Sequence, residues 1–351
     1  MKIWKKFIGA VVVILTVSIR VLYFEAAAGE KNAGENISYH FQKSRVYTYE
    51  EMSEDLSSLQ RKYGAVMTMD SLNTTCDGRK LFHIIIGNGK AERQALVFGS
   101  IHGREYITSQ LVMCQLADIL GRLQNQEDYR GEDLSKIFDR TALHIIPMIN
   151  PDGVTLCQRG LEAMKFQKTR QQLYRIYEMD QAVELDEYFR KWKSNARGVD
   201  LNRNFDAKWE DYDDRTGHPS SDHYKGSFPE SEIEAKALTE LTRQYLFQRT
   251  ISYHAQGNVI YWYFGQKGDL YRESREFAKL VAKATGYVAD ADYDKLDPAG
   301  YKDWAISAMK IPSLTVEVGT GGTPVPAEQF PIIWEQNKTV LLETMYDLYQ
   351  E

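Results

Sequence analysis

The sequence has few cysteines and no excess of positive charge. Only three cysteines, Cys76, Cys114 and Cys157, occur among 351 residues, and no two of them form a Cys-x-x-Cys pair. This argues against a disulfide scaffold and against a zinc site built from thiolates. Lys and Arg total 43 against 49 Asp and Glu, which gives a net charge of -6. Without a basic surface, nucleic acid is not expected as a partner.

Long apolar runs are absent except at the N-terminus. Residues 1–28 begin with three lysines, continue with an apolar stretch over 7–19 and end in three alanines, which is the pattern of a secretory signal peptide. An uncleaved membrane anchor is the alternative, and its span would have to include Arg20 and extend over 7–24, because about 20 residues are needed. We therefore expect an extracytoplasmic protein, either secreted or attached to the membrane. Residues 29–40 are small and polar and are interpreted as a linker.

From residue 41 onward, short β-branched runs alternate with helical patterns, which is typical of an α/β sheet covered by helices. We see no repeat and no second-domain boundary, so residues 41–351 are expected to form one domain. A charged, aromatic-rich stretch at about 161–193 is predicted to be an amphipathic helical insertion that packs against this domain. The predicted strands are 82–86, 95–100, 142–149, 250–253, 259–263 and 313–317, and the predicted helices are 48–63, 107–124, 229–245, 270–285, 299–308 and 331–349.

Two histidines and two glutamates lie at or near the ends of predicted strands. His102 and Glu105 follow the strand 95–100, His254 ends a second strand, and Glu317 lies near the end of a third. Open α/β sheets carry their ligand sites at the carboxyl ends of strands. His102, Glu105 and His254 are therefore a candidate metal site. Two imidazoles and one carboxylate leave the fourth zinc position open, as in catalytic zinc sites.

Two further residues fit a hydrolytic site of this kind. Zinc acidifies a bound water and polarises a carbonyl, and Glu317 is the candidate base that takes the proton of the water. Arg203 lies between two asparagines, and its planar, permanently charged guanidinium is suited to hold a substrate carboxylate by two bonds.

Taken in order from about residue 45 to 348, the chain resembles the zinc metallocarboxypeptidase family, which includes the carboxypeptidase A-like digestive enzymes. The resemblance implies a mixed sheet of about eight strands flanked by helices. It also implies one zinc ion on His102, Glu105 and His254, with Glu317 as general base, and Asn202 with Arg203 on the terminal carboxylate of the substrate. The matching segments are Ser100–Glu105, Asn150–Gly153, Gly198–Phe205, Ser252–His254, Gly300–Trp304 and Val316–Gly319.

The chain departs from the family pattern at three positions. The position of the family's oxyanion-stabilising arginine is taken by Lys193, with Arg197 as a nearby substitute. The family's mobile tyrosine falls near residue 295, so Tyr293 is the nearest candidate. Lys302 aligns with the base of the pocket for the released residue, which suggests an acidic group on that residue by charge complementarity. The alternative is that Lys302 simply pairs with its neighbour Asp303.

Function is expected from the branch of the family that this chain most resembles. About 100 residues precede His102, so no inhibitory pro-domain is expected, and the export signal, the insertion and Lys302 are similar to the bacterial enzymes that cut cell-wall peptides between γ-D-glutamate and meso-diaminopimelate. A general metallocarboxypeptidase acting on ordinary peptides is the first alternative. An inactive peptidoglycan-binding module is the second, and the intact ligands and base argue against it. We expect the protein to be a monomer.

Overall fold

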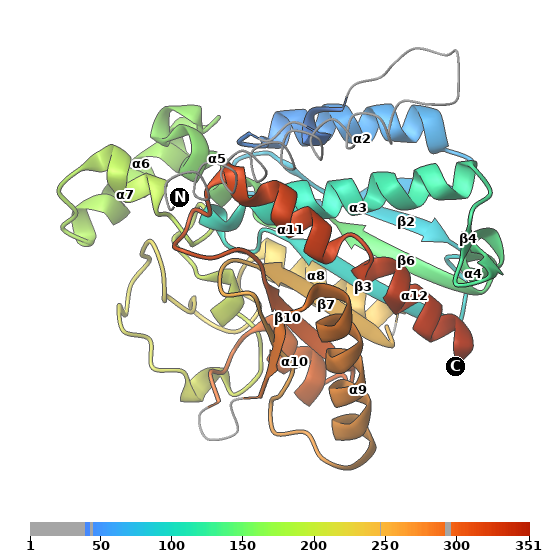
Figure 1. Cartoon of the computed structure of the whole chain (residues 1–351). Helices are drawn as coiled ribbons and strands as arrows, with labels where there is room; N and C mark the ends of the chain where they lie inside the picture. The colour runs from blue at the N-terminus through green and yellow to red at the C-terminus, as the bar shows by residue number, and fades with distance from the viewer. Residues whose placement is uncertain (1–38, 43–44, 246, 292–295) are drawn as a thin grey trace, which may run out of the picture.

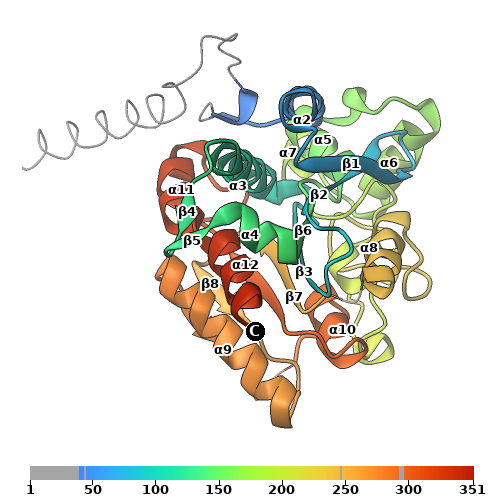
Figure 2. The ribbon, with the colours of Figure 1, turned by 90° about the vertical axis from the view of Figure 1, so that its right-hand side faces the viewer.

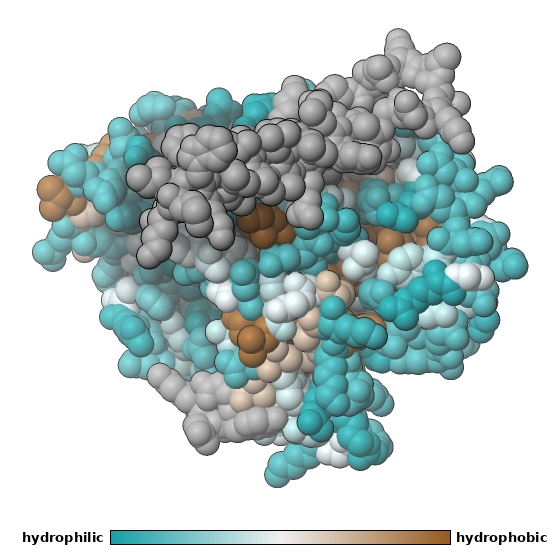
Figure 3. Space-filling model, viewed as in Figure 1, coloured by the Kyte–Doolittle hydropathy of each residue, from teal (hydrophilic) through white to brown (hydrophobic). Residues whose placement is uncertain are grey.

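The computed structural model describes residues 39–42, 45–245, 247–291 and 296–351. The predicted signal or anchor segment, most of the linker and Tyr293 lie outside the described residues. Within these ranges, none of the helices combines the length and the hydropathy that a membrane crossing requires. The face seen in Figure 3 is mostly hydrophilic, with small and separate apolar areas.

An eight-stranded mixed sheet forms the centre of the domain, in the order β1-β2-β6-β3-β7-β10-β8-β9. Its four central strands, β6, β3, β7 and β10, run parallel, and β2 and β8 flank them in the antiparallel direction. Helices cover both faces of the sheet, so its central strands are apolar and buried on both sides. The strands are β1 (Met67–Thr74), β2 (Lys80–Gly87), β3 (Arg93–Gly99), β6 (Thr141–Ile146), β7 (Arg249–His254), β8 (Val259–Tyr261), β9 (Val288–Asp290) and β10 (Ser313–Glu317).

Helices lie on both faces of the sheet (Figures 1 and 2), and each face carries a hydrophobic core. The larger core packs α2, α3, α4, α9, α11 and α12 against one face, and the smaller core packs α8 and α10 against the other. A short hairpin of β4 (Asp128–Tyr129) and β5 (Glu132–Asp133) precedes α4. The helices are α2 (Tyr49–Tyr63), α3 (Ile107–Gln124), α4 (Leu134–Arg140), α5 (Pro151–Arg159), α6 (Gln167–Met179), α7 (Leu185–Arg190), α8 (Ile233–Tyr245), α9 (Gly268–Thr285), α10 (Tyr301–Ser307), α11 (Phe330–Asn337) and α12 (Val340–Gln350).

The fold class predicted from the sequence is confirmed: it is α/β, with one mixed eight-stranded sheet flanked by helices. The prediction of one continuous helix over 331–349 is wrong, because residues 338–339 separate two helices, α11 and α12. The helix predicted over 229–245 begins only at Ile233. Sequence reasoning missed β1 and β9, which are largely exposed and carry little apolar alternation.

The stretch 161–193 contains a 3-10 turn (Leu161–Ala163) followed by α6 and α7, and it forms a separate lobe beside α5 (Figure 1). Its buried side chains make a small apolar cluster with α5. The insertion is therefore attached to the domain through a core of its own. Members of that cluster are Leu156, Cys157, Met164, Leu173, Ile176, Phe189 and Trp192.

The first described residues are held on the domain by one buried carboxylate. Asp55, on α2, is only 3% exposed and accepts hydrogen bonds from the N–H groups of His40 and Phe41 at 3.0 and 3.1 Å. It also accepts from the Tyr47 hydroxyl at 2.9 Å and contacts Nδ1 of His40 at 2.9 Å. Without this carboxylate, several donors would lose their partner together.

We expect Asp55→Ala to lower the free energy of unfolding by about 3 kcal/mol, because buried donors left without a partner cost about 1–3 kcal/mol each. Chemical denaturation followed by circular dichroism measures the loss. Glu54→Ala is the matched control, since the Glu54 side chain is 70% exposed and should matter little. Equal stability of the two variants would show that Asp55 does not hold this segment.

Candidate active site

Three neighbouring strands deliver the candidate residues to one edge of the sheet. β3 and β7 pair in parallel, with Gly99 opposite Tyr253, so the turn after β3 lies beside the end of β7. His102 lies just before the 3-10 turn that follows β3, and Glu105 is the last residue of that turn. His254 is the last residue of β7. β10 lies on the other side of β7 and places its last residue, Glu317, opposite His254. The four residues that the sequence placed at or near strand ends therefore lie at the same edge of the sheet, as predicted.

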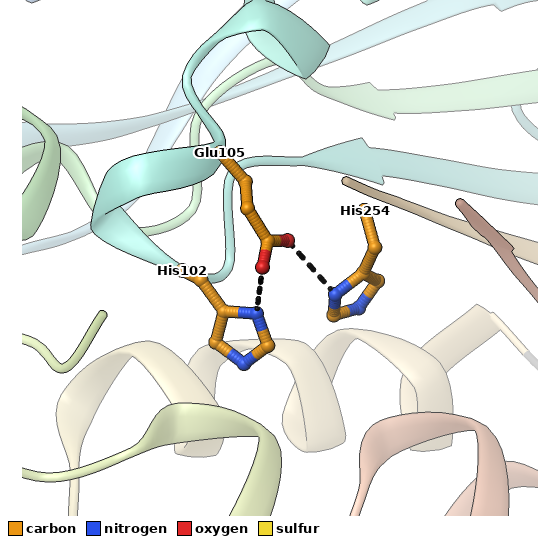
Figure 4. Close-up of side chains that lie close together, drawn as sticks. All are labelled: His102, Glu105 and His254. Atoms are coloured by element: carbon orange, nitrogen blue, oxygen red, sulfur yellow. Dashed lines mark hydrogen bonds and ion pairs between the residues drawn. The ribbon is translucent and has the colours of Figure 1, made fainter. Parts of the chain in front are cut away.

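His102, Glu105 and His254 converge on one point (Figure 4). Nδ1 of His102 lies 2.8 Å from Oε1 of Glu105, and Nδ1 of His254 lies 3.1 Å from Oε2 of the same carboxylate. Their candidate ligand atoms are all within 4.8 Å of one another, and the three side chains are buried. Within the described ranges, this is the one group of three or more His, Cys, Asp or Glu side chains with such spacing.

The surroundings of the two histidines fit a metal ion. Nε2 of His102 lies 3.2 Å from Oδ1 of Asp200, which orients the ring so that Nδ1 faces Glu105. Nε2 of His254 is buried and has no hydrogen-bond partner among the described residues, so Nδ1 is its one engaged nitrogen. Two imidazole nitrogens directed at one carboxylate, with a second carboxylate behind one ring, form a set of donors suited to zinc. Sequence reasoning did not single out Asp200, although it belongs to the segment that contains Arg203.

The two glutamates of the site have different electrostatic environments. Burial opposes the ionised form of Glu105, but the imidazoles of His102 and His254 outweigh it and hold the pKa of Glu105 below its usual range. Burial raises the pKa of Glu317 to about 7, and the nearby Glu105 adds to this effect. Glu105 is therefore ionised at neutral pH, whereas the ionisation of Glu317 changes near neutral pH.

Glycines allow the loops of the site to approach closely. A Cβ on Gly103 would lie 2.6 Å from the carbonyl oxygen of Gly153, and one on Gly153 would lie 2.5 Å from that of Ser194. Asn150, which caps α5, donates from its amide to the carbonyls of Ile101 and Ser194 at 3.0 and 3.1 Å. The segment 150–153 therefore joins the turn that carries His102 and Glu105 to the loop that follows the insertion.

The charged residues predicted to contact substrate lie around this centre. Nζ of Lys193 is 2.8 Å from Oδ2 of Asp200, and its charge acts on Glu317 as well. Arg203 forms an ion pair with Asp297 and packs over the ring of Tyr212 at 5.0 Å. Burial lowers the pKa of the Arg203 guanidinium, but the nearby carboxylates outweigh this and keep it charged.

Asn202 and Lys302 are held by contacts within the protein. Oδ1 of Asn202 accepts a hydrogen bond from the N–H of Tyr301 at 3.0 Å, so its oxygen fixes the start of α10. Nζ of Lys302 donates to the carbonyl of Tyr263 at 3.0 Å and also pairs with Asp303. The pairing with Asp303 that the sequence left open is therefore present. The roles of Glu317, Asn202, Arg203, Lys193, Tyr293 and Lys302 in binding or catalysis stay predictions.

Comparison with known proteins agrees with this geometry. The zinc carboxypeptidase family model matches residues 52–340. Gamma-D-glutamyl-L-diamino acid endopeptidase 1 of Lysinibacillus sphaericus is 32% identical over 301 residues, which cover 86% of this chain and 72% of the relative. Mast cell carboxypeptidase A of Homo sapiens is 26% identical, and the match covers 72% of this chain and 55% of that enzyme.

Solved structures share the fold at low sequence identity. Thrombin activatable fibrinolysis inhibitor aligns with a TM-score of 0.69 at 16% identity, over 93% of this chain and 80% of that one. Carboxypeptidase A from Helicoverpa armigera aligns with a TM-score of 0.64 at 18% identity, over 95% and 81% of the two chains. By the match over residues 52–340, this chain belongs to the zinc carboxypeptidase family and is a metallopeptidase.

Proposed function

We propose that this protein is a zinc peptidase that releases diaminopimelate or a related diamino acid from γ-D-glutamyl peptides of the cell wall. The observation that carries the zinc-peptidase part is the convergence of His102, Glu105 and His254 beside Glu317. The bond proposed is supported by the relative named gamma-D-glutamyl-L-diamino acid endopeptidase 1, which is 32% identical to this chain. The export pattern of residues 1–28 supports action outside the cytoplasm.

The side chains of the site have complementary roles in this reaction. His102, Glu105 and His254 would hold one zinc ion, which supplies a Lewis acid that acidifies water and polarises the scissile carbonyl. Glu317 accepts the proton of the attacking water and returns it to the departing amino group, a transfer that suits a buried carboxyl, because burial raises its pKa. Lys193 supplies a positive charge near Glu317 for the negative charge that develops on the carbonyl oxygen.

Arg203 is the proposed contact for the terminal carboxylate of the substrate. Its ion-pair partner Asp297 is 67% exposed at the side chain, whereas the Arg203 side chain is only 12% exposed, so Asp297 can turn to water while the guanidinium stays in place. A substrate carboxylate can therefore exchange with Asp297 at little cost. Two parallel bonds from the guanidinium to that carboxylate would orient the bond to be cut.

Lys302 is the proposed contact for the distal carboxylate of diaminopimelate. Its side chain is only 12% exposed, so charge interactions at this position are screened less than on the open surface. A general carboxypeptidase remains the second candidate, because Asp303 already neutralises Lys302 and because enzymes named carboxypeptidases also match this chain.

The first test compares two substrates, L-Ala-γ-D-Glu-meso-diaminopimelate and hippuryl-phenylalanine. We expect the purified protein to release free diaminopimelate, to lose this activity with a chelator and to regain it with zinc. Glu317→Gln should keep its zinc and lose at least about a hundredfold in kcat, which is the contribution of a general base. Hydrolysis of hippuryl-phenylalanine alone would favour the general carboxypeptidase, and zinc binding without any hydrolysis would favour the binding module.

The pH dependence follows from the ionisation of Glu317. The ionised form is the active base, and its pKa is about 7 without metal. A nearby zinc cation favours the ionised form and so lowers this pKa. As the pH falls, Glu317 becomes protonated and kcat/KM should decrease, with an apparent pKa below 7. Initial rates between about pH 5 and 9 measure this decrease, and zinc content at each pH is the control for metal loss. Activity that rises toward acid pH at constant zinc content would contradict a base role for Glu317.

Lys302→Met keeps the length of the side chain and removes its charge. If Lys302 binds the distal carboxylate, kcat/KM for the diaminopimelate peptide should fall about tenfold, equivalent to about 1.4 kcal/mol, mainly through KM. Hydrolysis of hippuryl-phenylalanine should not fall. Lys310→Met is the matched control, because the Lys310 side chain is exposed and donates a hydrogen bond to the carbonyl of Ser307. Equal losses with both substrates would place Lys302 in a structural role.

A further inference from the structure

Besides its apolar core with α5, the insertion has a polar contact with a distant part of the protein at Asp180, the residue that caps the C-terminal end of α6. Its Oδ2 accepts a hydrogen bond from the Ser220 hydroxyl at 2.7 Å and another from the N–H of Ser221 at 3.1 Å. The hydroxyl of Tyr188, on α7, donates to the same oxygen at 2.5 Å. One carboxylate oxygen thus joins both helices of the insertion to a distant stretch of chain, residues 218–224, which we call the 218–224 segment.

The 218–224 segment also contacts the loop that leads into the active site. The carbonyl of Ser221 accepts the N–H groups of Lys193 and Ser194, both at 3.0 Å. Further on, the carbonyl of Tyr224 accepts the N–H of Asp200 at 2.8 Å, and the N–H of His223 donates to Oδ2 of Asp200 at 3.3 Å. All four bonds use main-chain groups of the segment, so they depend on where its backbone lies.

Lys193 and Asp200 connect this loop to the metal site. The carbonyl of Lys193 accepts the N–H of Gly103, the residue after His102, at 2.9 Å. Nζ of Lys193 lies 2.8 Å from one oxygen of Asp200, and the other oxygen lies 3.2 Å from Nε2 of His102. A continuous series of hydrogen bonds therefore runs from the insertion to a candidate zinc ligand.

We propose that Asp180 is a positioning residue for the active site. Acting through the 218–224 segment, it fixes Lys193 and Asp200 against His102, which makes the insertion part of the active-site architecture. The proposal rests on the proposed function, because it requires that His102 holds the metal. Residues behind a metal ligand commonly change metal affinity or activity by about 10- to 100-fold when they are altered.

The contacts of Asp180 can be removed without removing the core of the insertion. Ile176, Phe189 and Trp192 pack with α5 in an apolar cluster that does not include Asp180. A loss of the carboxylate should therefore free the 218–224 segment while α6 and α7 stay folded. An amide at this position keeps an oxygen that can still accept hydrogen bonds from the 218–224 segment, so these bonds and the negative charge can be tested separately.

The experiment compares Asp180→Ala, Asp180→Asn and the matched control Glu178→Ala in the full-length protein. Glu178 is an exposed acid two residues away on α6. Each variant is loaded with cobalt or zinc, and three quantities are measured: the visible absorption spectrum of the bound cobalt, the dissociation constant for zinc, and kcat and KM per metal-loaded chain. Ser220→Ala, which removes a single donor of the 218–224 segment, is the second variant.

We expect Asp180→Ala to change the cobalt spectrum and to lower kcat about tenfold, with a smaller change in KM. The cobalt spectrum and kcat of Asp180→Asn should be close to those of the parent protein, and those of Glu178→Ala should equal them. Ser220→Ala should change the spectrum and kcat in the same direction as Asp180→Ala, but less. A parent-like cobalt spectrum and parent-like kcat in Asp180→Ala would overturn the proposal. If Asp180→Ala does not fold, a cobalt spectrum of Ser220→Ala that equals that of the parent protein would overturn the proposal.

The cobalt spectrum keeps this test separate from the choice of substrate. If the parent protein binds cobalt but hydrolyses neither peptide, the proposed function fails while the spectra of the variants still test Asp180. If the parent protein is active and the variants are indistinguishable from it, the proposed function stands and the positioning role fails.

Discussion

The parallel pairing of β3 with β7 is the constraint on which the rest of the site depends. Gly99 pairs with Tyr253, so the chain after β3 turns beside His254, and the turn places His102 and Glu105 within reach of it. A slip of one residue in this register would turn the side chain of His254 to the other face of the sheet. Because these strands are buried on both faces, the two hydrophobic cores that hold the register also fix the strand ends from which the candidate metal ligands extend.

The site separates two glutamates by their environment. Glu105 lies between two imidazoles and stays ionised, whereas Glu317 lies at the next strand end, where burial raises its pKa to about 7. If both carboxyls were protonated, Glu105 would lose the negative charge that a metal ligand needs. If both were ionised without a cation, two negative charges would lie close together. A metal dication held by His102, Glu105 and His254 would resolve this conflict, since it would favour the ionised form of both carboxyls. One residue type can thus serve as ligand and as base, because the surroundings differ.

Much of this architecture could be predicted from the sequence, because its signals are local. Buried strands are apolar on both faces, and a histidine at the end of such a strand has its position determined by the sheet. What the sequence did not reveal depends on contacts between distant residues. Asp200 orients His102 from 98 residues away, and Asp180 contacts Ser220 from 40 residues away. The edge strands β1 and β9 were missed because exposed strands need little apolar alternation. Tyr293 and the export segment stay predictions.

The two cations proposed to bind substrate differ in how easily they can do so. Arg203 is paired with the largely exposed Asp297, so a substrate carboxylate can replace that partner. Lys302 is paired with Asp303, which is only 3% exposed and also accepts the N–H of Gly300 at 3.0 Å, so this partner is fixed by the fold. A substrate group at Lys302 must therefore join an existing pair of charges. A lone carboxylate would meet Asp303 as well as Lys302, whereas the distal end of diaminopimelate carries a carboxylate and an ammonium group, one for each partner. If the proposed function holds, this pair of charges would therefore accept a zwitterionic side chain more readily than a simple acidic one.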